Sequence, residues 1–291
     1  PGPACYGQGG PLTITDVNVL LGRVDPDNFG IPLGDESIAA AKARLQELMR
    51  EMGTNEPEEE VLEGLLRIAV EQMADSIGTI SIREGANPSD YALLAFGGAG
   101  PLHACAIADR LGMSTILVPA EAGVLSAFGL HHAEVERFAE RQVLHNLADC
   151  PQIEDWLGEL RDEAAEKLGT ESQVRRRIAE LRLSGQEAPL DLEIDDADQL
   201  ATQFRAKYRP VFGYEPQPSQ PIELVSLRVV VSKPQTAKVS SVRLTAKNTA
   251  PKESGPFLNR AALSPGDQLS GPRIIQDPFS TLFLQTGWSA T

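Results

Sequence analysis

Cysteine and basic residues are both scarce in this chain of 291 residues. The three cysteines, Cys5, Cys105 and Cys150, are odd in number and widely spaced, which argues against a disulfide framework and against a zinc cluster. Lys and Arg number 26 against 41 Asp and Glu, a formal net charge of -15. A chain of this charge lacks the basic surface that grips nucleic acid or anionic lipid. We therefore expect no nucleic-acid partner and no metal site in these residues.

Long apolar runs are missing as well. No stretch approaches the roughly 20 residues that span a bilayer, and the N-terminus lacks the basic-then-apolar pattern of a secretion signal. Together with the reduced thiols that the cysteine spacing indicates, this predicts a cytoplasmic location and no membrane partner. Hydrophobic residues nonetheless make up 42% of the chain, enough for a substantial core and, at this length, for two domains.

The N-terminal half predicts a mixed α/β structure. It opens without Met on the loop "PGPACYGQGGPLTITD", which indicates a piece of a longer polypeptide. Helices are predicted at 15–22, 36–52 and 57–82 from apolar spacing, first-turn acids and terminal glycines. The apolar runs 91–98 and 115–118 predict buried strands that flank a helix starting at Gly100. Strand, helix and strand in so short a space imply a right-handed parallel crossover.

The character of the chain changes near residue 141. A charged helix precedes segments whose apolar and polar residues alternate, as in half-exposed antiparallel strands. A further helix, a strand ending near Lys233, a polar connector from Lys233 to Gly255 and a last apolar segment follow. We therefore expect a second domain, of α+β type, over residues 141–291.

The glycine loop "FGGAGPLHA" is the main candidate for a binding site. A Walker A loop would place Lys after Gly100 where Pro101 stands, and a dinucleotide-binding loop would place a small residue where His103 stands. Gly97 and Gly98 let a ligand approach the main chain, and Gly100 permits backbone angles barred to other residues. The residues alone leave a nucleotide loop and a structural turn equally open.

Long motifs in the chain resemble one known family. The stretches "GPACYGQGG", "TITDVNVLLGR", "FGGAGPLHACAIADRLG", "VPAEAGVLSAFGL" and "GPRIIQDPFSTLFLQTGW" look like successive signatures of the hydantoinase A / 5-oxoprolinase family. The oxoprolinase branch usually carries Gly-Gln where this chain has Pro101-Leu102, so the hydantoinase A branch matches better. The motifs stand in the family's order over nearly the whole chain.

The resemblance implies the C-terminal half of an actin-like ATPase core, with residues 1–140 as its second lobe and 141–291 as an accessory domain. In that fold a strand-Gly-Gly-helix element borders the adenosine and phosphates of ATP, and Gly97, Gly98, Ala99 and Gly100 match it. The family uses ATP to phosphorylate the carbonyl oxygen of a small cyclic amide, such as a hydantoin or 5-oxoproline. A hydantoinase B-type subunit or domain then completes ring opening.

One departure from the family limits this reading. Its first lobe begins with an Asp-Gly-Gly-Thr type phosphate loop, which this chain lacks. We expect that loop, and the acidic residues that hold Mg²⁺, upstream of Pro1, so the chain alone is expected to be inactive. An acetone-type ATP-dependent carboxylase subunit shares the architecture, and a noncatalytic assembly module is the alternative outside enzymes.

Individual residues keep two interpretations each. His103 is a candidate catalytic group because it stands where it could reach a phosphate or substrate, or else a helix-start histidine satisfied by backbone groups. Asp16 is a candidate for holding a metal or substrate, or else an N-cap. Ser126 is expected either to shape the nucleotide pocket or to form a turn. Cys5 and Tyr6 lie in a loop that could line the cleft, but no base near Cys5 is identifiable.

Overall fold

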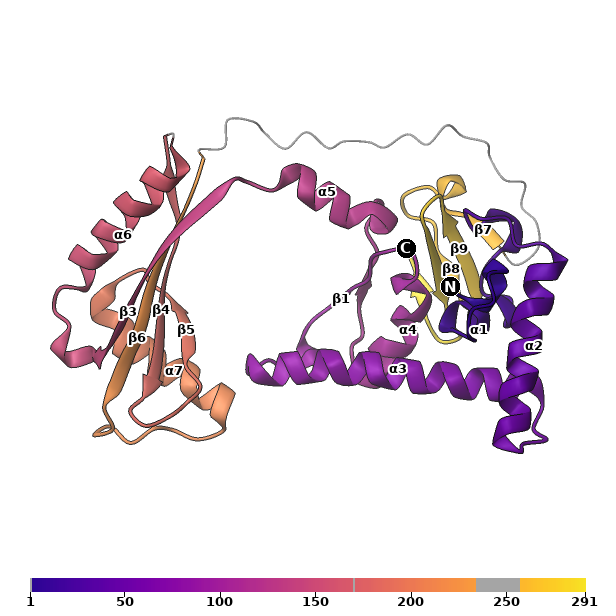
Figure 1. Cartoon of the computed structure of the whole chain (residues 1–291), viewed down its shortest axis with the longest axis horizontal. Coiled ribbons are helices and arrows are strands. Elements are labelled where there is room, and N and C mark those ends of the chain that lie inside the picture. Colours follow the sequence, from indigo (N-terminus) through magenta and orange to yellow (C-terminus); the bar gives the residue numbers. More distant parts are fainter. Residues whose placement is uncertain (1, 170, 234–256) are drawn as a thin grey trace. The chain divides into compact units, whose positions relative to one another are not determined.

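The computed structural model describes residues 2–169, 171–233 and 257–291, which form two compact units. The first unit comprises Pro1–Ser81, Asn87–Gly129 and Arg243–Thr291, and the second comprises Ile82–Ala86 and Leu130–Val242. Figure 1 shows the elements of each unit along the chain. Each unit has a hydrophobic core of its own, so each is described separately.

Three helices begin the first unit, close to their predicted bounds. They are α1 at Ile14–Leu20, α2 at Asp35–Met52 and α3 at Glu58–Arg83. Helix α2 ends because Gly53 adopts the left-handed conformation, with φ 63°, that glycine enters without steric cost. The apolar stripes of these helices bury the side chains of Ala41, Leu45, Leu62, Leu66 and Val70.

The predicted strand-helix-strand crossover follows. Strand β1 (Leu93–Leu94), helix α4 (Gly100–Leu111) and strand β2 (Ile116–Leu117) succeed one another, and the two strands pair in parallel. Both strands are much shorter than the apolar runs predicted, and they are not fully buried. Leu94 is 49% exposed and Leu117 is 54% exposed, because the described residues form only a two-stranded sheet here. Helix α5 (Leu125–His132) comes next.

The C-terminal strands belong to the first unit. They are β7 (Phe257–Asn259), β8 (Leu269–Ser270), β9 (Arg273–Asp277), β10 (Ser280–Leu284) and β11 (Ser289–Ala290). Strand β9 pairs antiparallel with β10 and parallel with β7, while β8 pairs with β11. The expected domain 141–291 is thus divided, because β10 packs against α4 rather than on the second unit's sheet.

The second unit is an antiparallel sheet with two long helices. Its strands are β3 (Glu136–Asn146), β4 (Gln173–Leu183), β5 (Leu190–Glu193) and β6 (Ile222–Ser232), in the order β3-β6-β4-β5. Helices α6 (Ile153–Leu168) and α7 (Leu200–Phe212) share one core with the sheet. The predicted antiparallel alternation is therefore confirmed. Most of the predicted connector, residues 234–255, lies outside the described residues.

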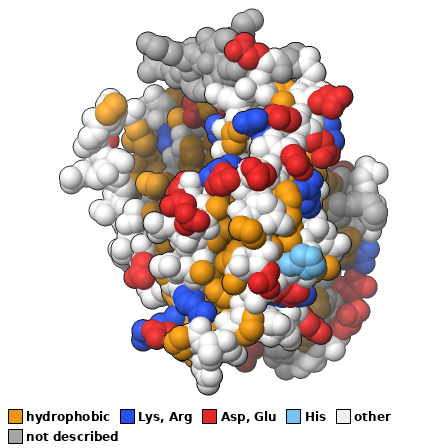
Figure 2. Space-filling view, turned by 90° about the vertical axis from the view of Figure 1, so that its left-hand side faces the viewer, with side chains coloured by type: hydrophobic (Ala, Val, Ile, Leu, Met, Phe, Trp, Pro, Cys, Tyr) orange, Lys and Arg blue, Asp and Glu red, His pale blue; other side chains and the backbone are white. Residues whose placement is uncertain are grey.

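The core of the second unit is aliphatic and aromatic. Its fully buried side chains come from both helices and from the two central strands, and include Leu160, Leu181, Phe204, Tyr208, Leu224 and Val229. Figure 2, which views the molecule from the side of α6, shows acidic and basic side chains interspersed among apolar ones. Exposed pairs of this kind, such as Lys167 with Glu163 on α6, add little stability, so the core holds this unit together.

Within the described residues, no helix is both long enough and apolar enough to cross a membrane.

Candidate functional site

The glycine loop connects β1 to α4 and presents its backbone at the surface. Gly97 has φ 84°, a left-handed conformation that favours glycine, and its N–H donates to the carbonyl oxygen of Ala122 at 2.7 Å. Gly98, Ala99 and Gly100 are exposed. Ala99 is the N-cap of α4 and has no side-chain oxygen for the first-turn N–H groups. The loop therefore offers exposed backbone and the positive end of a helix dipole to an anion.

The second predicted motif lies against this loop. The short 3₁₀ helix η4 (Ala122–Val124) supplies the carbonyl that binds Gly97, and α5 follows it directly. Ser126 lies in the first turn of α5 with an exposed side chain. Two motifs that are separate in the sequence thus lie together in space, and Ser126 is two positions beyond the end of η4.

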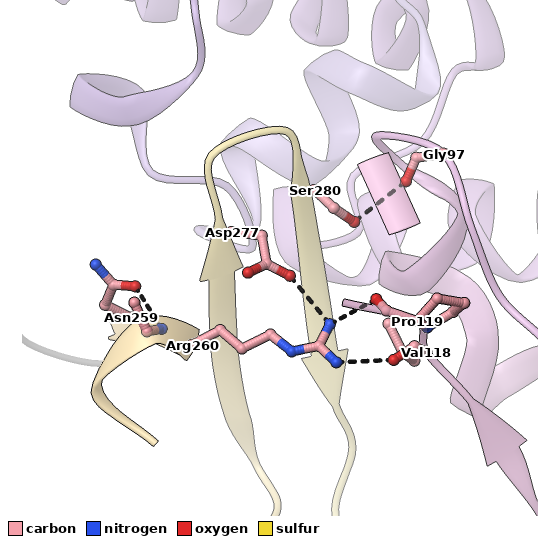
Figure 3. Close-up of polar contacts among 8 residues, drawn as sticks. Gly97, Val118, Pro119, Asn259, Arg260, Asp277 and Ser280 are labelled. Atoms are coloured by element: carbon pink, nitrogen blue, oxygen red, sulfur yellow. Dashed lines mark hydrogen bonds and ion pairs between the residues drawn. The ribbon is translucent and has the colours of Figure 1, made fainter. Parts of the chain in front are cut away.

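A third segment meets the loop from the far end of the chain, and sequence reasoning did not assign it to the site. The hydroxyl of Ser280 donates to the carbonyl oxygen of Gly97 at 3.1 Å, as Figure 3 shows. The N–H of Thr281 donates to the carbonyl oxygen of Gly98 at 3.3 Å. The stretch "DPFST" resembles part of a family motif, but its composition does not predict a contact with Gly97, 183 positions earlier.

Arg260 holds the same C-terminal strands to the crossover. Its guanidinium donates to the carbonyl oxygens of Val118 and Pro119 at 2.8 and 2.9 Å, and to Oδ2 of Asp277 at 3.1 Å (Figure 3). Burial raises the pKa of Asp277 and the charge of Glu121 adds to this, while Arg260 opposes it. The arginine is therefore the cation that compensates a partly buried carboxylate beside the glycine loop.

His103 is close to the loop in sequence but lies on the buried side of α4. Its side chain is 6% exposed, and its Nδ1 atom is buried without a hydrogen-bond partner. Burial lowers the pKa of His103 and the nearby charge of Arg23 lowers it further. Arg23 itself is bound to Glu63 at 2.6 Å and lies over the ring of Phe283. The imidazole is thus neutral near pH 7, and its catalytic role stays a prediction.

Asp16 is fully buried, and its carboxylate oxygens accept hydrogen bonds from backbone N–H groups and from one hydroxyl. Its carboxylate accepts hydrogen bonds from the N–H groups of Ala4, Cys5 and Thr13 at 3.1, 2.7 and 2.7 Å, and from the Thr13 hydroxyl at 2.8 Å. Burial acts to raise the pKa of Asp16, but the hydrogen bonds from Cys5 and Thr13 outweigh it and leave the pKa below its usual range.

These contacts revise the predicted cap of α1. The N-cap is Thr13, and Asp16 is the third helical residue of a capping box, so the prediction of Asp16 as the N-cap is wrong. The same carboxylate fixes the Cys5 loop, where burial and the Asp16 contact raise the pKa of the thiol to about 12. Cys5 is thus a protonated, buried thiol rather than a ready nucleophile. A ligand role for Asp16 stays a prediction.

Across the part of the chain that the structure describes, no group of three or more His, Cys, Asp or Glu side chains is placed to hold a metal ion. His131 and His132, adjacent on α5, pack edge to face at 5.0 Å between ring centroids.

Known proteins resemble this chain in sequence. The family model described as Hydantoinase/oxoprolinase matches residues 1–138, which include the glycine loop and the η4 motif. Residues 1–138 belong to the hydantoinase/oxoprolinase family. The 5-oxoprolinase of Dictyostelium discoideum is 28% identical over 100% of this chain and 26% of its own length. Caprolactamase subunit alpha of Pseudomonas jessenii is 26% identical over 99% of this chain and 46% of its own. The chain thus spans less than half of either relative.

Two solved structures share the fold. The crystal structure of ATP-dependent caprolactamase from Pseudomonas jessenii has a TM-score of 0.79 at 24% identity, covering 99% of this chain and 46% of that one. A nucleotide-free structure of acetone carboxylase has a TM-score of 0.64 at 20% identity, covering 98% of this chain and 46% of that one. These likenesses confirm the predicted mixed α/β fold.

Proposed function

We propose that this chain supplies the glycine-loop lobe of an ATP site in an ATP-dependent hydrolase of cyclic amides. The observation that carries the proposal is the exposed Gly98-Ala99-Gly100 backbone at the start of α4, in a family whose relatives include a 5-oxoprolinase and an ATP-dependent caprolactamase. Gly97, Gly98, Ala99 and Gly100 border the adenosine and the phosphates. Ser126 shapes the adjoining edge of the pocket.

The chemistry follows from the weakness of an amide as an electrophile. Transfer of the γ-phosphoryl group from ATP to the carbonyl oxygen of the ring would make the carbonyl carbon electrophilic enough for water to add. The ring C–N bond would then break as a proton passes to the nitrogen, and hydrolysis of the resulting acyl phosphate would release inorganic phosphate and the open-chain carboxylate. Mg²⁺ would neutralise charge on the phosphates during transfer. His103 is the catalytic candidate of α4, and because its imidazole is neutral it would accept a proton or a hydrogen bond rather than donate charge. Asp16 would act by fixing the Cys5 loop.

The surface of the β1–β2 sheet supports a role within a longer protein. Parallel sheets are normally covered on both faces, yet Leu94, Phe96 and Leu117 are each 46% to 54% exposed. We propose that further segments of the same cytoplasmic protein cover this sheet and supply the phosphate loop and the Mg²⁺ ligands, so that this chain alone is inactive. A hydantoinase B-type subunit completes the enzyme in this proposal, which is supported by a relative that is the alpha subunit of a caprolactamase.

The decisive experiment measures phosphate release by the full-length protein that carries this chain, mixed with its B-type partner. Hydantoin, 5-oxoproline and caprolactam are compared with acetone plus bicarbonate. Release stimulated by a cyclic amide supports the proposal, whereas stimulation by acetone and bicarbonate assigns the protein to the carboxylases. A protein that binds no ATP at all is the noncatalytic assembly module instead.

A loop variant ties the activity to these residues. A Cβ atom at Gly98 would lie 3.5 Å from the carbonyl oxygen of Phe279, an ordinary contact, so the Cβ atom of Gly98→Val is accommodated while its methyl groups crowd the loop, and an unchanged melting temperature checks that the fold is kept. Gly129→Ala is the matched control, because a Cβ atom there meets nothing within 4 Å. We expect Gly98→Val to weaken ATP binding at least tenfold and the control to leave it unchanged. Equal affinities would remove the loop from the site.

A further inference from the structure

The turn between β9 and β10 touches both loops of the proposed nucleotide site. Phe279 in this turn and Ser280, the first residue of β10, lie against Gly97, Gly98 and Gly123, although they come from the last part of the chain. We propose that this turn is the third wall of the site, in which Ser280 positions the glycine loop and the exposed ring of Phe279 receives the purine base. The inference rests on the proposed function, because it needs a nucleotide bound at the loop.

Ser280 acts on the loop from its inner side. The side chain is 6% exposed, and its hydroxyl is spent on the carbonyl oxygen of Gly97, the residue whose left-handed conformation turns the chain into the loop. The neighbouring N–H of Thr281 holds the carbonyl of Gly98 in the same way. With two consecutive carbonyls fixed from one side, the N–H groups of the loop keep a defined direction. Ser280 is therefore a positioning residue.

Phe279 differs from Ser280 in exposure, because its backbone packs against Gly123 while its side chain is exposed. A Cβ atom built on Gly123 would fall 2.2 Å from the carbonyl oxygen of Phe279, so only a glycine lets the two segments meet this closely. The side chain of Phe279 is nevertheless 59% exposed, which is unusual for a phenylalanine beside two glycine loops. An exposed aromatic face at such a place suits stacking with a base, and stacking of this kind tolerates any base with a π face.

Arg260 and Asp277 keep the turn in place. Asp277 is the last residue of β9, two positions before Phe279, and the arginine that it binds is itself bound to the carbonyls of Val118 and Pro119. The turn is thus anchored on both sides, through Ser280 to the glycine loop and through Arg260 to the end of β2. An anchored turn gives the ring a fixed position, which a stacking contact needs.

The test for Phe279 compares a ligand that has a base with one that lacks it. In the full-length protein, the affinities for ATP and for inorganic tripolyphosphate are measured by calorimetry for the native chain, Phe279→Ala and Phe279→Tyr. Phe138→Ala serves as the control, because Phe138 is similarly exposed, at 55%, on β3 of the second unit. We expect Phe279→Ala to lose about tenfold in ATP affinity and nothing for tripolyphosphate, with Tyr restoring the affinity for ATP.

The results separate the inference from the function on which it rests. If the native protein binds ATP and Phe279→Ala binds it equally well, or loses equally for both ligands, the base contact is overturned while the nucleotide site stands. If the native protein binds neither ligand, the proposed function fails and the inference falls with it.

Ser280 is tested with Ser280→Ala and the size-matched Ser280→Cys, against Ser270→Ala on the exposed strand β8. We expect both Ser280 variants to raise the KM for ATP about fivefold while kcat for phosphate release stays nearly unchanged, in addition to the modest loss of stability that a lost buried hydrogen bond brings. A merely structural serine would lower the melting temperature and leave the KM where it was, and that outcome overturns the positioning role.

Discussion

Nη2 of Arg260 donates a hydrogen bond to the carbonyl oxygen of Val118 at 2.8 Å, across 142 positions of sequence. The same guanidinium binds Pro119 and Asp277, so one side chain joins the end of β2 to the C-terminal strands. Carbonyl groups at the end of a two-residue strand have few partners within the sheet, and a guanidinium with several donors suits them. The end of the crossover is therefore bound by Arg260, a residue that the sequence analysis assigned to the second domain.

Arg260→Ala should lower the free energy of unfolding by about 2 kcal/mol, because it removes charged hydrogen bonds and leaves Asp277 without its cation. Arg273→Ala is the matched control, since Arg273 is an exposed arginine on β9. Denaturant titration monitored by tryptophan fluorescence measures both. A loss for Arg260→Ala no larger than that of the control would contradict the anchoring role.

Gly123→Ala should destabilise the first unit by about 2 kcal/mol or displace the β9–β10 turn, because the new Cβ atom would overlap the backbone of Phe279. Gly129→Ala, in helix α5 with open space around it, should be neutral or slightly stabilising, since alanine favours helix over glycine. Melting temperatures of the two variants give the comparison. Equal melting temperatures would mean that the turn does not pack on Gly123.

Asp16→Asn should cost about 3 kcal/mol, because the amide keeps one acceptor but brings donors against the N–H groups that the carboxylate now accepts. The pKa of Asp16 is depressed in the folded chain, so its contribution is full above the ordinary aspartate pKa and is lost as the pH falls through the depressed value.

The unfolding free energies of the native chain and Asp16→Asn should therefore converge in strong acid. Asp35 is an exposed acid in the first turn of α2 and serves as the control. Asp35→Asn should change the free energy of unfolding little at any of these pH values. A full-sized Asp16→Asn effect that persists at a pH where the carboxyl is protonated would contradict the assignment.

His103 should make the folded chain less stable as the pH falls below about 6.5, the ordinary value for histidine. Its pKa is lowered by burial and by Arg23, so in this range the unfolded chain takes up a proton that the folded chain does not. Each pKa unit between the two states is worth about 1.4 kcal/mol. Comparing stability at pH 7.5 and 5.5 should show a smaller drop for His103→Gln than for the native chain and for His131→Gln.

Local patterns predicted most of the helices. The stripe of α2 and its stop at Gly53, the first-turn acids of α3 and the glycines before α4 each act within a few residues, and the structure places those helices within one or two residues of the predicted bounds. The predicted lengths of β1 and β2 were too long. An apolar run such as 91–98 indicates that its residues can be buried, but it does not tell which other segment of the chain covers them.

The candidate site was predicted only in part, because local patterns do not reveal which distant segments pack against the loop. Gly97 to Gly100 are marked by their composition, but the contacts of Ser280 and Phe279 with that loop depend on tertiary packing and leave no periodicity in the sequence. The change of character near residue 141 was visible, whereas the return of residues 257–291 to the first unit was not. The contacts of Arg260 and Asp277 that hold residues 257–291 in the first unit are visible only in the folded structure.

The bond between Ser280 and Gly97, across 183 positions, also has a consequence for how the protein is made. Contacts this distant require a large loop to close, which slows folding compared with local contacts. During synthesis the glycine loop leaves the ribosome long before the turn that supports it, while the second unit, whose strands are encoded between them, is already free to form. The glycine loop therefore reaches its supported form only after translation has passed residue 281.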